Sequence, residues 1–233
     1  MDKYNSDSKV SYILGISLIV EALKEVPKVV EKVVLSTKAN KNNELDKLLS
    51  LCNKHNVEIE ENDDLISKLS LKENCYGIGI FSKYAKPLET NRHIVLYGFD
   101  SEGELGTIIR SSVSFDFKDI VLINSDIDIF NPKVVRASMG SFFHVNIKKY
   151  SSLEEYFKEY KYNIYPFTGD GTYELKSLKL NKPYSIIIPS KYHQLDGQFM
   201  DACYIKHANQ DEISLTSLSS IVLNYAYHLN LKR

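Results

Sequence analysis

Short runs of β-branched residues alternate with segments of helical spacing, and this alternation constrains the fold more than any other feature of the chain. In the first third, apolar residues from Ile19 to Val26 recur at helical spacing, and Pro27 ends that helix. We expect further helices around residues 45–52 and 65–69, and strands at residues 33–35, 57–59 and 77–81. The alternation predicts a small α/β domain in this part of the chain.

The alternation starts again after residues 83–92, a mostly polar stretch that contains Pro87 and predicts a linker. Strands are expected at residues 94–97, 120–123, 142–147 and 184–188, and helices from about residue 105, from Pro132, at 153–160 and at 216–229. Strands that alternate with helices in this way predict a mostly parallel sheet covered on both faces. We therefore predict a small amino-terminal α/β domain at residues 1–86 and a larger α/β domain at residues 87–233.

The charge balance does not identify a partner, because 29 basic and 30 acidic residues leave a net charge of −1. Nucleic-acid-binding chains more often have a basic excess, so any RNA contact must come from local clusters of cations. Only four basic residues are arginines, at positions 92, 110, 136 and 233. In a chain that otherwise uses lysine, an internal arginine is a candidate for recognising phosphate or carboxylate groups.

Cysteine content and hydropathy exclude several classes of protein. The three cysteines, Cys52, Cys75 and Cys203, are far apart and odd in number, so they predict neither a zinc site nor a disulfide framework. No apolar run approaches the roughly 20 residues that a membrane span needs, and residues 1–9 do not have the pattern of a targeting signal. We expect a cytoplasmic protein without a bound metal.

The segment at residues 104–110 combines a glycine and an arginine near the expected start of a helix. Gly106 would allow close backbone approach there, and Arg110, one turn further on, would point at an anion bound at the helix end. The alternative is that Arg110 pairs with an acidic neighbour such as Glu104 or Asp116.

The segment at residues 131–141 reads Asn-Pro-Lys-Val-Val-Arg-Ala-Ser-Met-Gly-Ser. Asn131 suits a helix N-cap, Pro132 the first helical position and Gly140 a left-handed helix end. The small residues at 137, 138, 140 and 141 leave room for a ligand to approach closely. Tight packing of the helix against a strand explains them equally well.

Together with the strand expected between them, these two segments resemble the first motif blocks of the SpoU/TrmH family of knotted RNA methyltransferases. The first block is similar to N-x-G-x-x-x-R-T-A, and the second to N-P-K-x-x-R-A-S-x-G. The resemblance implies a SPOUT-type α/β domain with a carboxy-terminal trefoil knot, preceded by a small substrate-binding α/β domain. It also implies a homodimer through the carboxy-terminal domain and S-adenosylmethionine-dependent methylation of ribose 2′-hydroxyl groups in rRNA or tRNA.

The resemblance assigns roles to particular residues. Arg110 would bind phosphate or stabilise the developing alkoxide, and Glu104 would either pair with Arg110 or accept the hydroxyl proton. RNA would be bound by Arg110, Lys133, Arg136 and Ser138. The cofactor would be held by loops of the knot, at Thr168, Gly169, Ile188, Pro189, Ser190, Lys191, Leu195, Ile205, Ser214, Leu215 and Thr216.

Three substitutions depart from the family's motifs. Glu104 replaces an asparagine, Lys191 replaces a glutamate, and Pro189 replaces a glycine and has no amide N–H to donate. The alternative function is therefore a non-catalytic relative that acts as a dimeric RNA-binding module. A protein that binds another nucleotide-like ligand in the same pocket is the third possibility.

Overall fold

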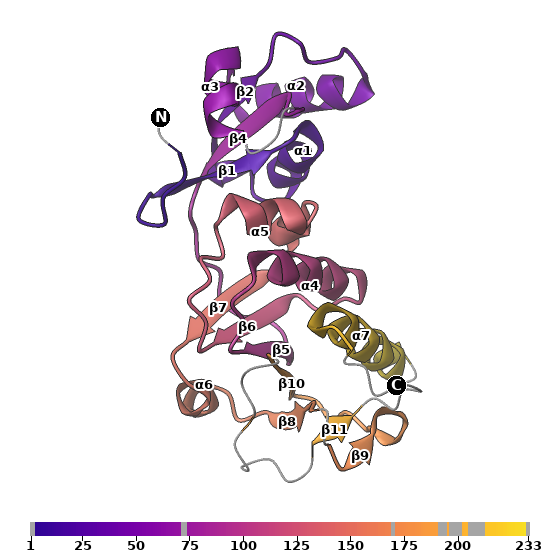
Figure 1. Cartoon of the computed structure of the whole chain (residues 1–233). Helices are drawn as coiled ribbons and strands as arrows, with labels where there is room; N and C mark the ends of the chain where they lie inside the picture. The colour runs from indigo at the N-terminus through magenta and orange to yellow at the C-terminus, as the bar shows by residue number, and fades with distance from the viewer. Residues whose placement is uncertain are drawn as a thin grey trace. The chain divides into compact units, whose positions relative to one another are not determined.

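The computed structural model describes residues 3–70, 74–168, 171–190, 195, 202–204 and 213–231. The chain forms two compact units (Figure 1): unit 1 contains Met1–Tyr84 and Asp128–His144, and unit 2 contains Ala85–Ile127 and Val145–Arg233. The chain therefore passes between the units three times. The sequence predicts residues 128–144 within the second domain, whereas in the structure they pack on unit 1.

Unit 1 is built on a four-stranded sheet in the order β1-β4-β2-β3, formed by Val10–Leu14, Gly77–Ser82, Val30–Leu35 and Glu58–Glu61. Strand β4 runs antiparallel to both β1 and β2, and β2 is parallel to β3. The sheet of unit 1 is therefore mixed. Its helices are α1 (Ile16–Glu25), α2 (Asn43–His55) and α3 (Asp63–Leu69), with a short 3-10 turn η1 (Pro27–Val29).

Strand β1 was not predicted from the sequence. Its apolar residues run directly into those of α1, and only Gly15, with φ of +125°, separates the strand from the helix. Glycine tolerates this backbone conformation because it has no Cβ. The two elements then bury Ile13 and Ile19 completely.

The returning segment Asp128–His144 contains α5 (Pro132–Ala137) and the 3-10 turn η2 (Ser141–His144). Phe81 of β4 packs against the rings of Phe130, Phe142 and Phe143, with centroid distances of 6.2, 6.4 and 5.7 Å. The strand predicted at residues 142–147 is wrong in its first part, because these aromatic side chains fold the chain into η2 and β7 begins only at Asn146.

Unit 2 contains a five-stranded parallel sheet in the order β7-β6-β5-β10-β8. Its strands are Asn146–Tyr150, Asp119–Ile123, Arg92–Tyr97, Tyr184–Pro189 and Asn163–Pro166. All residues of β6 are buried, as expected for a central strand covered on both faces.

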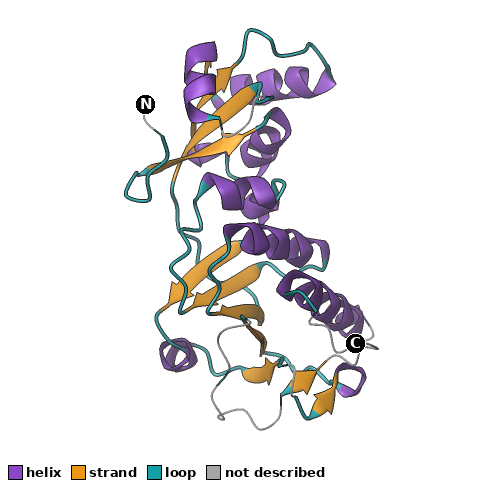
Figure 2. Ribbon diagram, in the orientation of Figure 1, coloured by secondary structure: helices purple, strands orange, loops and turns teal. Residues whose placement is uncertain are grey.

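Three helices cover this sheet. Helix α6 (Leu153–Glu159) contributes Leu153 and Tyr156 to the cluster that contains Val95, Val121 and Ile187. Figure 2 shows α4 (Glu102–Ser114) and α7 (Leu215–Leu231) on the other side of the sheet. A short parallel pair, β9 (Tyr173–Glu174) with β11 (Cys203–Tyr204), and the turn η3 (Leu175–Ser177) complete the described part of the unit. No helix within the described ranges is long and apolar enough to cross a membrane.

Candidate functional site

The carboxyl ends of β5 and β10 lie side by side at the point where the strand order of the parallel sheet reverses. The chain passes from β5 outward through β6 to β7, and then fills the opposite side with β8 and β10. Pro189 is in register with Tyr97, and the Ser190 N–H donates to the Tyr97 carbonyl oxygen at 2.8 Å. Open parallel sheets bind ligands at such a reversal, outside the carboxyl ends of the strands.

Three segments with predicted cofactor contacts are joined at this edge by backbone hydrogen bonds. The Phe167 N–H donates to the Ile187 carbonyl oxygen at 2.8 Å, and the Thr168 N–H donates to the Cys203 carbonyl oxygen at 3.0 Å. The structure therefore brings Thr168 next to β10, which carries Ile188 and Pro189, and next to β11. Predicted residues Gly169, Lys191 and Ile205 lie outside the described residues.

Gly171 fits closely into the join between these segments. A Cβ at this position would lie 2.6 Å from the Cys203 carbonyl carbon and 2.7 Å from the Ala202 carbonyl oxygen. The Thr172 N–H donates to the same Ala202 oxygen at 2.8 Å. The spacing between the two segments thus depends on the absence of a side chain at residue 171.

The segment that follows β5 leads directly into α4. Gly98 has φ of 70°, and its N–H donates to the Ile123 carbonyl oxygen at 2.8 Å. The Ser101 side chain then caps α4 by accepting from the Glu104 N–H at 3.3 Å. Gly98 and Ser101 were not predicted as site residues, although a glycine directly after a strand and the Ser-x-x-Glu pattern are both present in the sequence.

The early start of α4 corrects the predicted place of Arg110. The helix begins at Glu102, so Gly106 lies buried within it, and Arg110 is eight positions beyond its first residue. At 1.5 Å per residue, this places Arg110 about 12 Å along the axis from the helix start. Arg110 is therefore about two turns from the amino end of α4, where a bound anion was expected.

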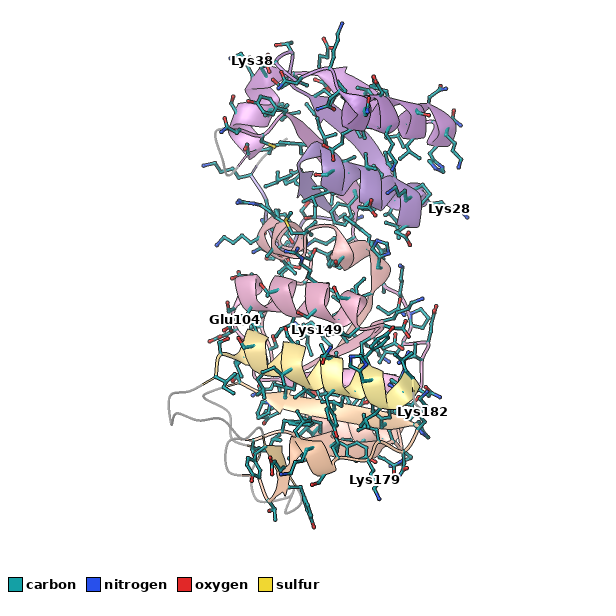
Figure 3. All side chains as sticks on the ribbon, turned by 90° about the vertical axis from the view of Figure 1, so that its right-hand side faces the viewer. Lys28, Lys38, Glu104, Lys149, Lys179 and Lys182 are labelled. Atoms are coloured by element: carbon teal, nitrogen blue, oxygen red, sulfur yellow. The ribbon has the colours of Figure 1, made fainter. Side chains whose placement is uncertain are left out.

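Arg110 and Glu104 are separate in the structure. Figure 3 shows Glu104 at the amino end of α4, and its side chain is half-buried. Arg110 is exposed, and its guanidinium has no hydrogen bond or ion pair within the part of the chain that the structure describes. The expected neighbour Asp116 instead binds Arg92, with an N–O distance of 2.8 Å. Pairing of Arg110 with Glu104 or Asp116 is thus not observed.

The predicted contacts near the carboxyl terminus lie at the start of α7. The Ser214 Oγ accepts from the Ser217 N–H at 3.2 Å, and so caps the helix whose first residues are Leu215 and Thr216. Helix α7 packs along α4, and the Oγ atoms of Ser111 and Ser220 are 2.8 Å apart. Ser214 therefore has a structural role independent of any cofactor.

The predicted RNA contacts on α5 differ in their accessibility. Lys133 is exposed, and Arg136 is half-buried. Ser138 is completely buried, and its Oγ donates to the Val135 carbonyl oxygen at 2.7 Å and accepts from the Phe142 N–H at 3.2 Å. Ser138 thus supports the turn from α5 to η2 and offers no surface to RNA in this structure.

The small residues after α5 are explained by close packing within unit 1. Gly140 has φ of 91°, and a Cβ there would lie 3.1 Å from Glu21 Cγ on α1. His144 lies 3.5 Å from carboxylate oxygens of both Glu21 and Glu25. Tight packing, which was one explanation of this segment, is therefore what the structure shows, with α1 rather than a strand on the other side.

The described edge of the sheet offers backbone carbonyl oxygens, hydroxyl groups and, at the start of α4, the carboxylate of Glu104. In the described ranges, no group of three or more His, Cys, Asp or Glu side chains is arranged to hold a metal ion. Leu195 packs beside the cluster that contains Val95 and Ile187. The site can therefore combine an apolar floor with hydrogen-bonding groups, an arrangement common in cofactor pockets.

The chain is similar to a known protein family in sequence and to several solved structures in fold. Residues 91–192 match the model of the SpoU rRNA Methylase family. An rRNA methyltransferase from Sinorhizobium meliloti has a similar structure, with a TM-score of 0.78 and 19% identity over 95% of this chain and 88% of that one. The SpoU methyltransferase AviRb from Streptomyces viridochromogenes, in complex with AdoMet, gives 0.81 and 16% over 96% and 91%.

A third structure, an RNA 2′-O ribose methyltransferase, has a TM-score of 0.79 and 19% identity over 96% of this chain and 90% of that one. No curated protein sequence matches the chain. At these identities the structural likeness establishes the fold, while the family model covers the part of the chain that contains β5, α4, β6 and β10. The resemblance read from residues 104–147 is confirmed, because residues 91–192 match the model of the SpoU rRNA Methylase family.

Proposed function

We propose that this protein transfers a methyl group from S-adenosylmethionine to a ribose 2′-hydroxyl of rRNA or tRNA. The observation that carries the proposal is the hydrogen-bonded join of the segments at Phe167, Ile187 and Cys203, beside the strand that leads into α4. Two of the similar structures are named for an RNA 2′-O ribose methyltransferase and for a SpoU methyltransferase with AdoMet. Their functions support the same reaction here.

The residues at this edge fit the cofactor. The carbonyl oxygens of Thr168 and Ser190 and the side chain of Leu195 would hold its polar and apolar parts. Ile188 is completely buried, so it would support the pocket without contacting the cofactor. When bound, S-adenosylmethionine supplies a methyl group on a positively charged sulfur. Formation of the knot by the carboxy-terminal segment is part of this proposal, because it would close the loops around the cofactor.

Arg110 and Glu104 divide the remaining chemistry. Arg110 is exposed, so its guanidinium is accessible to a phosphate of the RNA or to the developing alkoxide. It cannot serve as the base, because an arginine keeps its proton in proteins. The Glu104 carboxylate would accept the proton that the ribose 2′-hydroxyl loses on methylation.

We further propose a homodimer that packs through unit 2. Ile221 on α7 is 42% exposed, although it is a large apolar residue in the middle of a helix. A partner subunit packed on α7 would remove this side chain from water. Sedimentation velocity with Ile221→Asp would test the interface, and an unchanged dimer would contradict it.

The alternative is a dimeric RNA-binding protein without methyl transfer, and Pro189 favours it. Pro189 ends β10 at the proposed pocket and has no amide N–H to offer a ligand. This substitution removes one possible donor, and the N–H groups of Ser190 and Thr168 already donate within the protein, but backbone carbonyl oxygens at this edge can still accept hydrogen bonds from a ligand. We therefore retain methyl transfer as the proposed function.

Two measurements test the proposal. Calorimetric titration with S-adenosylhomocysteine should give a Kd of roughly micromolar order. Incubation with tritiated S-adenosylmethionine and RNA from cells that lack the gene should transfer label to ribose. Cofactor binding without transfer to any RNA would support another substrate, whereas RNA binding without detectable cofactor binding would support the non-catalytic alternative.

A further inference from the structure

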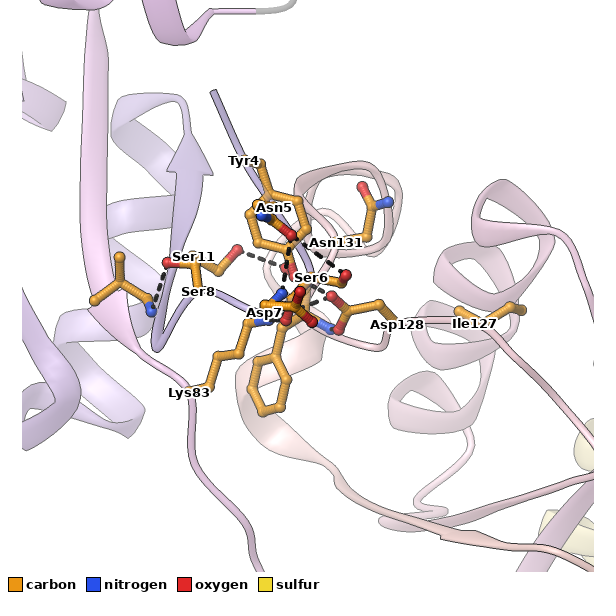
Figure 4. A network of polar contacts seen from close by, with 12 residues as sticks. Tyr4, Asn5, Ser6, Asp7, Ser8, Ser11, Lys83, Ile127, Asp128 and Asn131 are labelled. Atoms are coloured by element: carbon orange, nitrogen blue, oxygen red, sulfur yellow. Dashed lines mark hydrogen bonds and ion pairs between the residues drawn. The ribbon is translucent and has the colours of Figure 1, made fainter. Parts of the chain in front are cut away.

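Three side chains of unit 1 meet where the returning segment begins (Figure 4). The Asp128 carboxylate accepts hydrogen bonds from the Tyr4 hydroxyl and from Lys83 Nζ, the latter at 3.3 Å. Lys83 Nζ also donates to the Ser6 carbonyl oxygen at 2.6 Å and lies 4.9 Å from the centroid of the Tyr4 ring. We call Tyr4, Lys83 and Asp128 the latch.

The latch joins parts of the chain that are far apart in sequence. The first stretch of unit 1 ends at Tyr84, directly after Lys83, and the second stretch begins at Asp128. The Lys83–Asp128 contact therefore closes the intervening loop, which contains β5, α4 and β6, at its base. Tyr4 adds the amino-terminal segment to the same point.

The environment favours a persistent interaction. The Lys83 and Asp128 side chains are only 17% and 24% exposed, so water screens their attraction less than at an open surface. Burial and the Asp128 charge both raise the pKa of Tyr4, so this hydroxyl stays protonated and donates. Ser11 Oγ holds the next turn by donating to the Phe130 carbonyl oxygen at 2.5 Å.

The latch bears on the orientation of α5 because that helix is short. It has six residues, and an isolated helix of this length is not stable in water. Asn131 caps it by accepting from the Lys133 N–H at 3.0 Å, only three positions after Asp128. The direction of the Lys133 and Arg136 side chains therefore depends on the anchor before the helix as well as on the packing of Phe142 and Phe143 after it.

We propose that Tyr4, Lys83 and Asp128 are positioning residues for RNA binding, which hold α5 on unit 1 so that Lys133 and Arg136 bind RNA phosphates as part of that unit's surface. This inference rests on the proposed function, because it requires an RNA partner. RNA would then contact unit 1 through residues that the chain order assigns to the methyltransferase region.

The test uses Tyr4→Phe, which removes one hydroxyl and no charge, so a loss of RNA affinity cannot come from a lost cation. Fluorescein-labelled bulk tRNA and rRNA fragments serve as probes. In the wild-type protein, Lys133→Ala with Arg136→Ala should weaken binding about tenfold and reduce the salt dependence. In the Tyr4→Phe background the same pair should cost only about twofold, because the cations are no longer held in place.

Asp128→Asn provides a second disruption should Tyr4→Phe fold poorly, and Lys28→Met is the control that removes an exposed cation of unit 1 outside the latch. Hydrogen exchange at residues 128–144 should become faster in both latch variants and stay unchanged in the control. If the Lys133→Ala and Arg136→Ala pair lowers RNA affinity equally in both backgrounds, or if hydrogen exchange is unchanged, the role of the latch is overturned and the proposed function is not affected. Absence of any RNA binding by the wild-type protein overturns the proposed function with it.

Discussion

The Nδ1 atom of His93 lies 2.8 Å from the hydroxyl oxygen of Tyr156, and the Tyr156 oxygen lies 2.6 Å from the Oγ of Ser185. These three buried residues join β5, α6 and β10 at the amino ends of the strands, at the edge of the sheet opposite the candidate site. Asp119, also buried, lies 3.9 Å from His93 Nε2 and accepts from Asn146 Nδ2 at 2.7 Å. The network links the strands of the sheet at the edge that does not carry the candidate site.

His93 should make the stability of the fold dependent on pH. Burial lowers the pKa of His93 below its usual 6.5, although the negative charge of Asp119 opposes this. The unfolded chain therefore binds a proton more readily, and stability should fall as the pH drops below about 6.5, by at most about 1.4 kcal/mol per pH unit for one proton. Above about pH 6.5, the contribution of the buried, neutral His93 to the free energy of unfolding is fully present.

Urea unfolding of the wild type and of His93→Gln between pH 7.5 and 5.5 gives the free energy of unfolding of each protein as a function of pH. The difference between the slopes of these two plots is the contribution of His93. The groups that face His93 are Asp119, Tyr156, Tyr160, Tyr162 and the more distant Glu159, and both proteins retain them. His228→Gln is the control, because His228 is exposed. Parallel curves for wild type and His93→Gln would show that His93 has no such role.

Gly171→Ala should weaken cofactor binding. The new Cβ would lie 2.6 Å from the Cys203 carbonyl carbon, and backbone atoms cannot move aside as a flexible side chain does. Overpacking of this kind costs about 1–3 kcal/mol, and we expect affinity for S-adenosylhomocysteine to fall at least about tenfold. Calorimetry measures the effect, and Gly103→Ala, where the added Cβ meets nothing within 4 Å, should bind normally. Equal affinities for both variants would remove Gly171 from the pocket.

The central strands of unit 2 could be predicted from sequence because their burial depends on local composition. Residues 120–123 and 186–188 are apolar, mostly β-branched runs, as is typical of strands covered on both faces. The start of α4 was also readable, because Ser101 and Glu104 form a capping pattern. Local chemistry alone decides such features.

The placement of residues 128–144 could not be predicted in this way. It depends on contacts between residues that are far apart, such as Tyr4 with Asp128, 124 positions later, and Phe81 with Phe143. The sequence of α5 shows where a helix begins and ends, but not which unit it packs on. The burial of Ser138 follows from that packing, which is why an RNA contact was a reasonable expectation from sequence and is not supported by the structure.

Arg110→Ala should abolish most methyl transfer without destabilising the protein. The side chain is exposed and has no polar partner within the described part of unit 2, so its removal should change the free energy of unfolding by less than about 0.5 kcal/mol. Loss of a group that stabilises developing charge should lower the rate about 10²–10³-fold. Transfer of tritiated methyl groups to RNA measures it, with Lys118→Ala, another exposed cation of unit 2, as the control.

Arg110→Lys separates charge from geometry. A lysine keeps the positive charge but cannot form the paired hydrogen bonds of a guanidinium, so we expect only partial recovery of the rate. A fully active Arg110→Ala variant would exclude the residue from catalysis. Full activity of Arg110→Lys alone would instead show that charge suffices.

Glu104→Gln tests the carboxylate that replaces the family's asparagine. Because Glu104 does not pair with Arg110 among the described residues, the variant should not raise activity by releasing that arginine. If the carboxylate accepts the hydroxyl proton, the rate should fall about 10²–10⁴-fold, while affinities for RNA and S-adenosylhomocysteine stay unchanged.

Glu104 also lies in the first turn of α4, where a negative charge stabilises a helix by about 0.3–1 kcal/mol. Glu102→Gln is the matched control, since it removes a charge from the same turn and should reproduce the loss of stability without the loss of rate. Wild-type rates in both variants would mean that Glu104 serves only the start of the helix, and a faster Glu104→Asn enzyme would contradict the proton-acceptor role directly.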